Sequence, residues 1–278
     1  MEWDAPAIVL AARPYGEGDA LATVLTQAHG AHRGLARGGA SRAKANIWQP
    51  GNLVQVRWVA RLDDQLGSFT AELVHPGAAL AMDDALSLAI LSAACALAEG
   101  ALIEREAHPA VFAGLLRLIT RLSDPCAALT DYILWEATLL TDLGYGMDLS
   151  SCALTGATTG LAWVSPRTGH AVGRDAAEPW QGRLLPLPAF FTADPAADPA
   201  TDAPADPAAW RDGMRLTGHF LARDVFGNQH RPLPPARHRL ADRVATLAQT
   251  VAQTETETET GAGADDPGPL GGDSGPVV

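Results

Sequence analysis

Six basic side chains lie in a stretch of sequence that holds no acidic residue. The chain has 32 Asp and Glu against 20 Lys and Arg, with a formal net charge of −12. Residues 30–62 nevertheless contain no carboxylate, where the average acid frequency would place about four. Positive side chains on a glycine-rich, flexible loop with Trp48 and Trp58 nearby suit a phosphate backbone and unstacked bases. We predict a DNA-binding site formed by Arg33, Arg37, Arg42, Lys44, Arg57 and Arg61.

The same stretch has a plainer interpretation. A solvated loop followed by outward-facing strand arginines would produce the same pattern, and this segment alone does not decide between the two. His29 and His32 lie next to the basic residues, and we expect them to be surface-loop histidines.

No motif of an enzyme or of a metal site is present. The sequence lacks a Walker loop, a GxGxxG after a strand, an HExxH, a GxSxG and a CxxC pair. We therefore expect no enzymatic activity and no cofactor, although a convergent acid–base site need not leave a sequence motif. Cys95, Cys126 and Cys152 are odd in number and far apart, which fits a reducing cytoplasm better than a disulfide framework.

The N-terminal 76 residues have the pattern of a small β-barrel. Five short strand-like runs are separated by turn residues, and Val54, Val56 and Trp58 alternate with Gln55 and Arg57. Five strands in this length predict an OB-type barrel, and an SH3-like barrel would give the same pattern.

The remaining chain alternates helical and irregular segments. Apolar spacing predicts helices over 85–98, 109–122 and 130–143, and two more near 207–226 and 235–252. The run at 85–98 is shorter than the roughly 20 residues of a membrane span, so we expect a buried helix and no membrane association. Residues 249–278 hold six acids and no base, and the Thr-Glu repeats from Thr254 onward, with the Gly, Pro and Asp that follow, predict disorder.

Three segments together resemble the RecO family of bacterial recombination mediators. They are GLARGGASRAK with QPGNLVQVRW and ARLDDQLGSF, the run from DLGYGMDL to LLPLPAFF, and LTGHFLARDVFG with LPPARHRL. The resemblance covers about residues 5–191 and 210–247, with the segments in the family's order.

The resemblance implies an α+β multidomain protein. We expect an N-terminal OB-fold barrel followed by an α-helical domain that carries an inserted loop-rich, degenerate zinc-finger-like module. The expected divisions are an OB-fold domain at 1–78, helical parts at 79–147 and 209–252, the module at 148–192, an Ala/Pro/Asp low-complexity loop at 193–208, and a disordered acidic tail at 253–278.

One departure from the family concerns zinc. Some members hold a zinc ion with two Cys pairs in the module, whereas this chain has Thr155 three residues after Cys152 and no Cys between 164 and 180. One Cys cannot supply the four ligands of a structural zinc site. We expect a metal-free module packed around Leu161, Trp163, Val164, Val172, Trp180, Leu184 and Leu185.

The resemblance also implies a function. Such proteins bind single- and double-stranded DNA, anneal complementary strands, and act with RecR to load the recombinase onto DNA coated by single-strand DNA-binding protein. RecF and RecA complete the expected partners, and a cytoplasmic, nucleoid-associated location follows. The alternative is a protein-interaction adaptor whose OB barrel binds a peptide.

Overall fold

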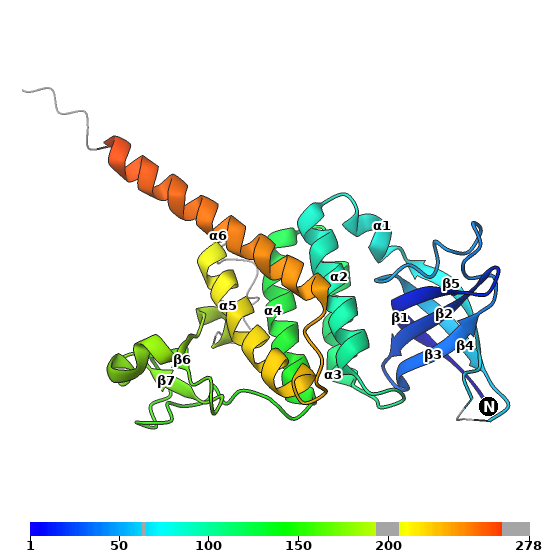
Figure 1. The fold of residues 1–278 in the computed structure, drawn as a ribbon, viewed down its shortest axis with the longest axis horizontal. Helices are drawn as coiled ribbons and strands as arrows, with labels where there is room; N and C mark the ends of the chain where they lie inside the picture. The colour runs from blue at the N-terminus through cyan, green and yellow to red at the C-terminus, as the bar shows by residue number, and fades with distance from the viewer. Residues whose placement is uncertain (63–64, 193–205, 263–278) are drawn as a thin grey trace, which may run out of the picture.

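A closed five-stranded barrel forms the N-terminal part of the computed structural model, which describes residues 1–62, 65–192 and 206–262 (Figure 1). The ring order is β1-β2-β3-β5-β4, and only β3 and β5 among these neighbours run parallel. The predicted OB-type barrel is confirmed. The strands are β1 (Glu2–Tyr15), β2 (Asp19–Thr26), β3 (Gly30–Ala36), β4 (Leu53–Val59) and β5 (Ser68–His75).

The barrel is filled by the inward side chains that the alternation predicted. Val54, Val56 and Trp58 are buried, whereas Arg57 between them is exposed. Trp48 is also buried, with its ring stacked 6.0 Å from that of Phe69. Both tryptophans of the basic stretch are therefore core residues, so the expectation that they flank bound bases is wrong.

The barrel is completed by a segment from the helical part of the chain. β3 and β5 pair only through Leu35 with Ser68 and Ala36 with Phe69, which leaves the first half of β3 without a neighbouring strand on the side opposite β2. Arg105 fills this place by donating its backbone N–H to the carbonyl oxygen of Ala31 at 2.7 Å. The barrel and the helices are thus parts of one structure.

Six α-helices follow the barrel in the part of the chain that the structure describes. Asp84 begins the second by accepting hydrogen bonds from the N–H groups of Leu86 and Ser87, and the predicted buried helix is confirmed there. Among the described residues, no helix combines the length and apolarity needed to cross a bilayer. The helices are α1 (Gly77–Ala81), α2 (Ala85–Ala101), α3 (Pro109–Thr120), α4 (Pro125–Asp142), α5 (Pro207–Phe220) and α6 (Pro235–Ala262).

Two helix ends differ from the prediction. α4 begins five residues before the predicted residue 130, because Asp124 caps it and Pro125 occupies its first turn. α6 continues to Ala262, beyond the predicted end at residue 252. Residues 263–278 of the predicted tail, and residues 193–205 of the low-complexity loop predicted at 193–208, lie outside the described residues.

The loop-rich module is built around a three-stranded antiparallel sheet and the thiol of Cys152. The strands β6 (Leu161–Val164), β7 (Ala171–Gly173) and β8 (Leu185–Pro186) pair in the order β7-β6-β8. Cys152 is buried, and its Sγ accepts a hydrogen bond from the Gly173 N–H at 3.2 Å. In the described chain, no three His, Cys, Asp or Glu side chains gather closely enough to hold a metal ion. The side chains present around Cys152 therefore do not fit the zinc site with two Cys pairs that the resemblance implies for some members of the family.

One residue of the predicted module core is misplaced. Trp180 lies on the 3₁₀ turn η1 (Glu178–Arg183) and is 50% exposed, whereas Val164 is fully buried. The short turn keeps its side chain on the surface.

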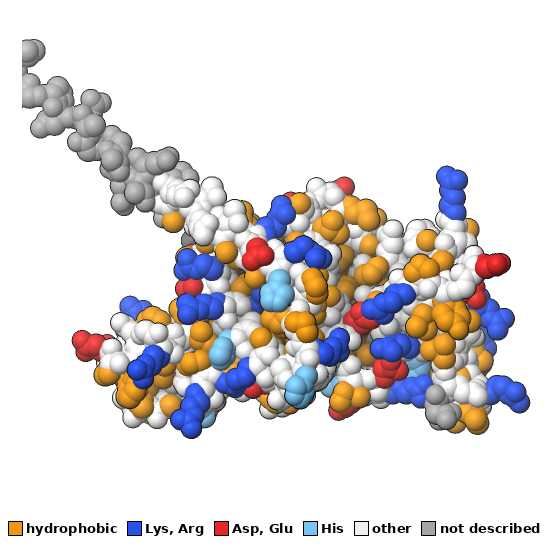
Figure 2. Space-filling model, in the orientation of Figure 1, with side chains coloured by type: hydrophobic (Ala, Val, Ile, Leu, Met, Phe, Trp, Pro, Cys, Tyr) orange, Lys and Arg blue, Asp and Glu red, His pale blue; other side chains and the backbone are white. Residues whose placement is uncertain are grey.

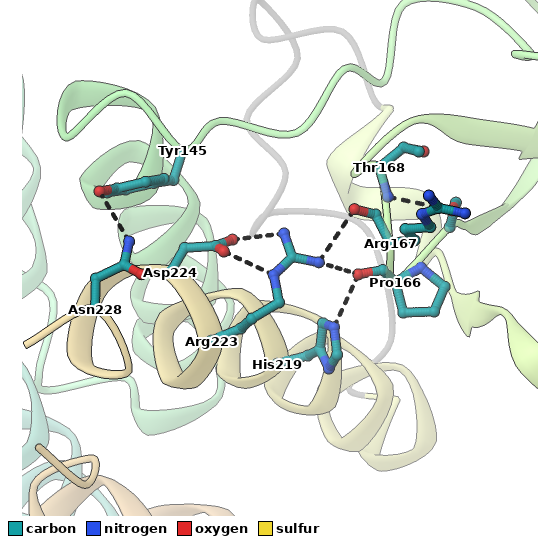
Figure 3. Close-up of polar contacts among 9 residues, drawn as sticks. Tyr145, Pro166, Arg167, Thr168, His219, Arg223, Asp224 and Asn228 are labelled. Atoms are coloured by element: carbon teal, nitrogen blue, oxygen red, sulfur yellow. Dashed lines mark hydrogen bonds and ion pairs between the residues drawn. The ribbon is translucent and has the colours of Figure 1, made fainter. Parts of the chain in front are cut away.

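The module is attached to the end of α5 and to the π-helical turn η3 (Leu221–Phe226) that follows it (Figure 3). Arg223 donates to both carboxylate oxygens of Asp224, at 2.6 and 2.7 Å, and to the carbonyl oxygen of Pro166. His219 lies with its Nε2 3.0 Å from the same carbonyl oxygen. These contacts hold the β6–β7 turn against the helical body.

A buried ion pair joins three helices of the body. Arg237 of α6 donates to both carboxylate oxygens of Glu136 on α4, at 2.5 and 3.0 Å, and both side chains are almost fully buried. Tyr132 and Thr217 each donate a hydroxyl hydrogen bond to this carboxylate at 2.5 Å. Burial and the Glu136 charge raise the pKa of Tyr132 well above its ordinary value, so the phenol stays protonated as a donor.

We predict that Arg237→Met lowers the free energy of unfolding by about 3–5 kcal/mol, because it leaves the Glu136 carboxylate buried without its cation. Urea unfolding measures this. The double variant Glu136→Gln with Arg237→Met should recover part of the loss, since no net charge stays buried. Arg239→Met, at an exposed position of the same helix, should change stability little. Equal stability of Arg237→Met and the unmodified protein would contradict the prediction.

Candidate nucleic-acid interface

The barrel separates the six predicted basic residues into two groups. Arg33 lies on β3, Arg37 follows that strand directly, and Arg42 and Lys44 lie in the segment between β3 and β4. Arg57 lies on β4 and Arg61 follows it. In the ring, β5 separates β3 from β4 on one side, and β1 and β2 separate them on the other. The ring therefore separates Arg33 from Arg57 and Arg61, which the sequence placed with it in one site.

The first group belongs to a continuous outer surface of β1, β2 and β3. Arg13 pairs with Leu21 and Leu21 with Leu35 across the strands, so these three side chains share one face. On either side of this row, the same face carries Arg33 and Tyr15. We call the surface formed by Arg13, Tyr15, Leu21, Arg33, Leu35 and Arg37 the barrel face. Figure 2 shows apolar side chains flanked by Lys and Arg over this part of the barrel.

The segment of residues 37–49, here called the basic loop, is ordered by hydrogen bonds rather than flexible as expected. The Gly38 N–H donates to the Asp19 carboxylate at 2.7 Å, and the Ser41 hydroxyl donates to the Gly38 carbonyl at 2.6 Å. At the far end, the Asn52 side-chain amide donates to the Asn46 carbonyl at 2.7 Å. Gly38 has φ +67°, a conformation that favours glycine. The loop is thus tied to the β1–β2 turn and to the start of β4.

The charges of the basic loop have no counterion within the described residues. Arg37, Arg42 and Lys44 are exposed, and the Lys44 ammonium donates only a long hydrogen bond, 3.4 Å, to the Arg37 carbonyl. By contrast, Arg33 pairs with Glu104 at 2.8 Å and Arg57 with Glu2 at 2.8 Å. An incoming anion would meet uncompensated positive charge on the loop and compensated charge at Arg33 and Arg57.

Sequence reasoning missed two members of the barrel face. Arg13 and Tyr15 precede the acid-free stretch, in a segment that also contains Glu17 and Asp19. Tyr15 is 58% exposed and stands beside the turn whose Asp19 holds the basic loop. It provides the exposed aromatic ring that Trp48 and Trp58 do not. The signal available in the sequence was an aromatic residue at a Pro-Tyr-Gly turn.

His32 is a core residue rather than the surface histidine that was expected. It is 4% exposed, and its ring packs edge-to-face on Trp58 at 4.7 Å and on Trp3 at 5.2 Å. Neither ring nitrogen has a hydrogen-bond partner among the described residues. Burial, with the nearby charges of Arg105 and His29, lowers the pKa of His32 to about 4. His32 is therefore neutral at neutral pH and is not a phosphate ligand.

Comparison with known proteins gives the same family along most of the chain. The family model described as Recombination protein O N terminal matches residues 1–76, and the model described as Recombination protein O C terminal matches residues 82–233. The DNA repair protein RecO of Granulibacter bethesdensis is 61% identical over 251 residues, covering 90% of this chain and 98% of that protein. Those of Acidiphilium cryptum and Gluconacetobacter diazotrophicus are 58% and 54% identical, covering 88% and 89% of this chain and 96% of each relative.

We predict that His32 makes the barrel less stable as the pH falls. The unfolded chain takes up the His32 proton near pH 6.5 and the folded chain near pH 4, so this contribution is present above 6.5 and lost between those values. The difference in unfolding free energy between the unmodified protein and His32→Phe should fall at up to about 1.4 kcal/mol per pH unit. Denaturant titrations at several pH values measure it.

The matched control is His238→Gln, because His238 is exposed on α6. Its difference from the unmodified protein should have no such slope. A flat difference for His32→Phe as well would show that the buried imidazole does not titrate below its ordinary pKa.

Proposed function

The chain belongs to the RecO family of DNA repair proteins, and from this premise we propose that it is a DNA-binding mediator of repair and recombination. It binds single- and double-stranded DNA through the basic loop and the barrel face. The observation that carries this proposal is the ordered loop with Arg37, Arg42 and Lys44 exposed and without counterions, next to Tyr15. No bond-breaking step is part of the proposed role.

The mode of binding follows from the residue types. Arg and Lys side chains bind backbone phosphates irrespective of sequence, and an exposed aromatic ring stacks on any unpaired base, at about 1–3 kcal/mol per base. The barrel face holds no set of Asn, Gln or carboxylate side chains that would read base edges. The proposed contacts are therefore tolerant of sequence.

The first group of basic residues serves this site, whereas Arg57 and Arg61 form a separate surface. Arg57 is already paired with Glu2, and β5 lies between β4 and β3 in the ring. We assign these two residues a lesser contribution to DNA affinity than the sequence suggested.

The proposal extends to the partners expected of this family. The chain anneals complementary strands and acts with RecR to load the recombinase RecA onto DNA coated by single-strand DNA-binding protein, in the pathway of RecF. The α-helical body supports this part of the proposal, because it supplies a large surface beside the barrel for protein partners.

Charge reversal separates the two groups of basic residues. The triple variant Arg37→Glu, Arg42→Glu and Lys44→Glu should weaken binding to a fluorescent single-stranded oligonucleotide by at least about tenfold. It should also reduce the slope of log affinity against log salt by about 2, since each lost phosphate contact removes about 0.7. Fluorescence anisotropy across a salt series measures both quantities.

The matched control is Arg57→Glu with Arg61→Glu, which should keep most of the affinity and the slope. If the control loses affinity and the triple variant does not, the site lies on β4. A salt-independent affinity for the unmodified protein would favour the alternative adaptor role.

Annealing tests the mediator role directly. The purified protein should accelerate pairing of complementary oligonucleotides, bare or coated with single-strand DNA-binding protein, without nucleotide or added metal, because the pairing of two strands breaks no covalent bond. Energy transfer between end-labelled strands follows the reaction, with heat-denatured protein as the control. DNA binding without annealing of coated strands would reduce the role to plain DNA binding.

A further inference from the structure

A groove of about 500 Å³ lies where the barrel meets the helical body. The barrel side is lined by Arg13 and Arg33 of the barrel face, and the body side by Glu99 of α2 and by residues 231–235 before α6. Figure 2 shows Lys and Arg side chains on both sides of this junction. The groove is therefore the direct continuation of the barrel face toward the helices.

Three guanidinium groups from three separate parts of the chain line this groove. Arg13 bonds to Glu99 at 2.6 Å across the junction, and its side chain remains 61% exposed. Arg33 bonds to Glu104 at 2.8 Å and is 47% exposed. Each of these two arginines keeps an open side toward the solvent in spite of its carboxylate partner.

Arg231 differs from the other two because no carboxylate neutralises it within the described residues. Its Nη1 donates to the Gly100 carbonyl and to the Gln229 side-chain oxygen, both at 3.3 Å. Neutral acceptors at this distance orient the guanidinium without compensating its charge. Arginine stays charged at any physiological pH, so the body side of the groove presents a positioned cation to an anion.

We propose that a single DNA strand bound on the barrel face continues into this groove, and that Arg231 binds its backbone phosphate there. The proposal rests on the proposed function and adds the helical body to the DNA site. Arg33 and Arg37 face outward from the same strand and lie about 13 Å apart along it. Stacked nucleotides rise about 3.4 Å each, so about four of them span the distance between the basic loop and the groove, and fewer do so in an extended strand.

The surroundings of Arg231 favour a single strand. Leu233 and Pro235 line the groove on the same side, so apolar surface lies next to the phosphate-binding group. A sugar or an unstacked base can cover such surface, whereas paired bases of a duplex are not available for it. Bound DNA would then contact both parts of the protein and hold them together.

The length of the oligonucleotide provides the test. Oligothymidylates of about 4 to about 20 nucleotides are titrated by fluorescence anisotropy at low salt against the full-length protein and Arg231→Gln. The shortest should bind both proteins equally, because they are held by the basic loop alone. The longer ones should bind Arg231→Gln about 5- to 10-fold more weakly, with a salt slope lower by about 0.7.

Arg239→Gln is the matched control, because Arg239 is exposed on α6 and is not part of the groove. It should bind every length as the unmodified protein does. Equal affinity of Arg231→Gln for all lengths overturns the proposal while leaving the barrel site intact. Failure of the unmodified protein to bind any length overturns the proposed function itself.

A second readout addresses the other class of ligand. A glutamate- and aspartate-rich peptide is titrated against the same three proteins. If Arg231→Gln loses affinity for this peptide and not for the long oligonucleotides, the groove belongs to a protein partner and the proposal is wrong. Loss for the oligonucleotides alone supports it.

Discussion

Burial of β1 on both of its faces is the constraint on which the rest of this structure depends. Ala7 and Val9 point into the barrel core, while Ile8 and Leu10 belong to the core of the helical body, and all four are almost completely buried. A strand that is covered on both faces needs a continuous apolar run rather than alternation, which is why residues 7–10 read Ala-Ile-Val-Leu. The helical body consequently covers the outer surface of β1 near Ile8 and leaves it exposed near Arg13. This division determines where on the barrel the barrel face and the groove lie.

The local pattern of apolar and polar residues was sufficient to predict the strands and helices. How these elements are arranged in space could not be predicted from the sequence. The alternation of Val54, Val56 and Trp58 and the buried helix that begins near residue 85 each depend on neighbours within a few residues, and both were predicted. The grouping of Arg33 with Arg13, and its separation from Arg57, depends on the ring order of strands that are distant in sequence. An acid-free stretch is continuous in sequence, whereas a barrel distributes its strands around a circle, so charge along the chain did not predict charge on one face.

The module is held together by main-chain contacts, without the zinc ligands that the resemblance implies for some members of the family. A structural zinc ion would order a small loop-rich segment through four ligands. Here the Cys152 sulfur is buried, and the Gly173 N–H and the Thr155 hydroxyl lower the pKa of its thiol to about 7, with Thr155 the larger cause. Arg223 and His219 add contacts from the helical body to the carbonyl of Pro166. The turns of the module are thus held by hydrogen bonds.

The counterions around the basic residues suggest a division of labour in binding. Arg13 and Arg33 must exchange a carboxylate for a phosphate, so each gains little net free energy, although their ion pairs hold them in place before the strand arrives. The basic loop has no carboxylate to give up among the described residues, and its hydrogen bonds reduce the entropy lost when a ligand orders it. The affinity for DNA should therefore come mainly from the basic loop. The paired arginines at the junction should set the path that the bound strand follows. An acidic protein can bind a polyanion in this way because its charge is segregated: among the described residues, the ordered basic loop and Arg231 present positive charge that no carboxylate compensates.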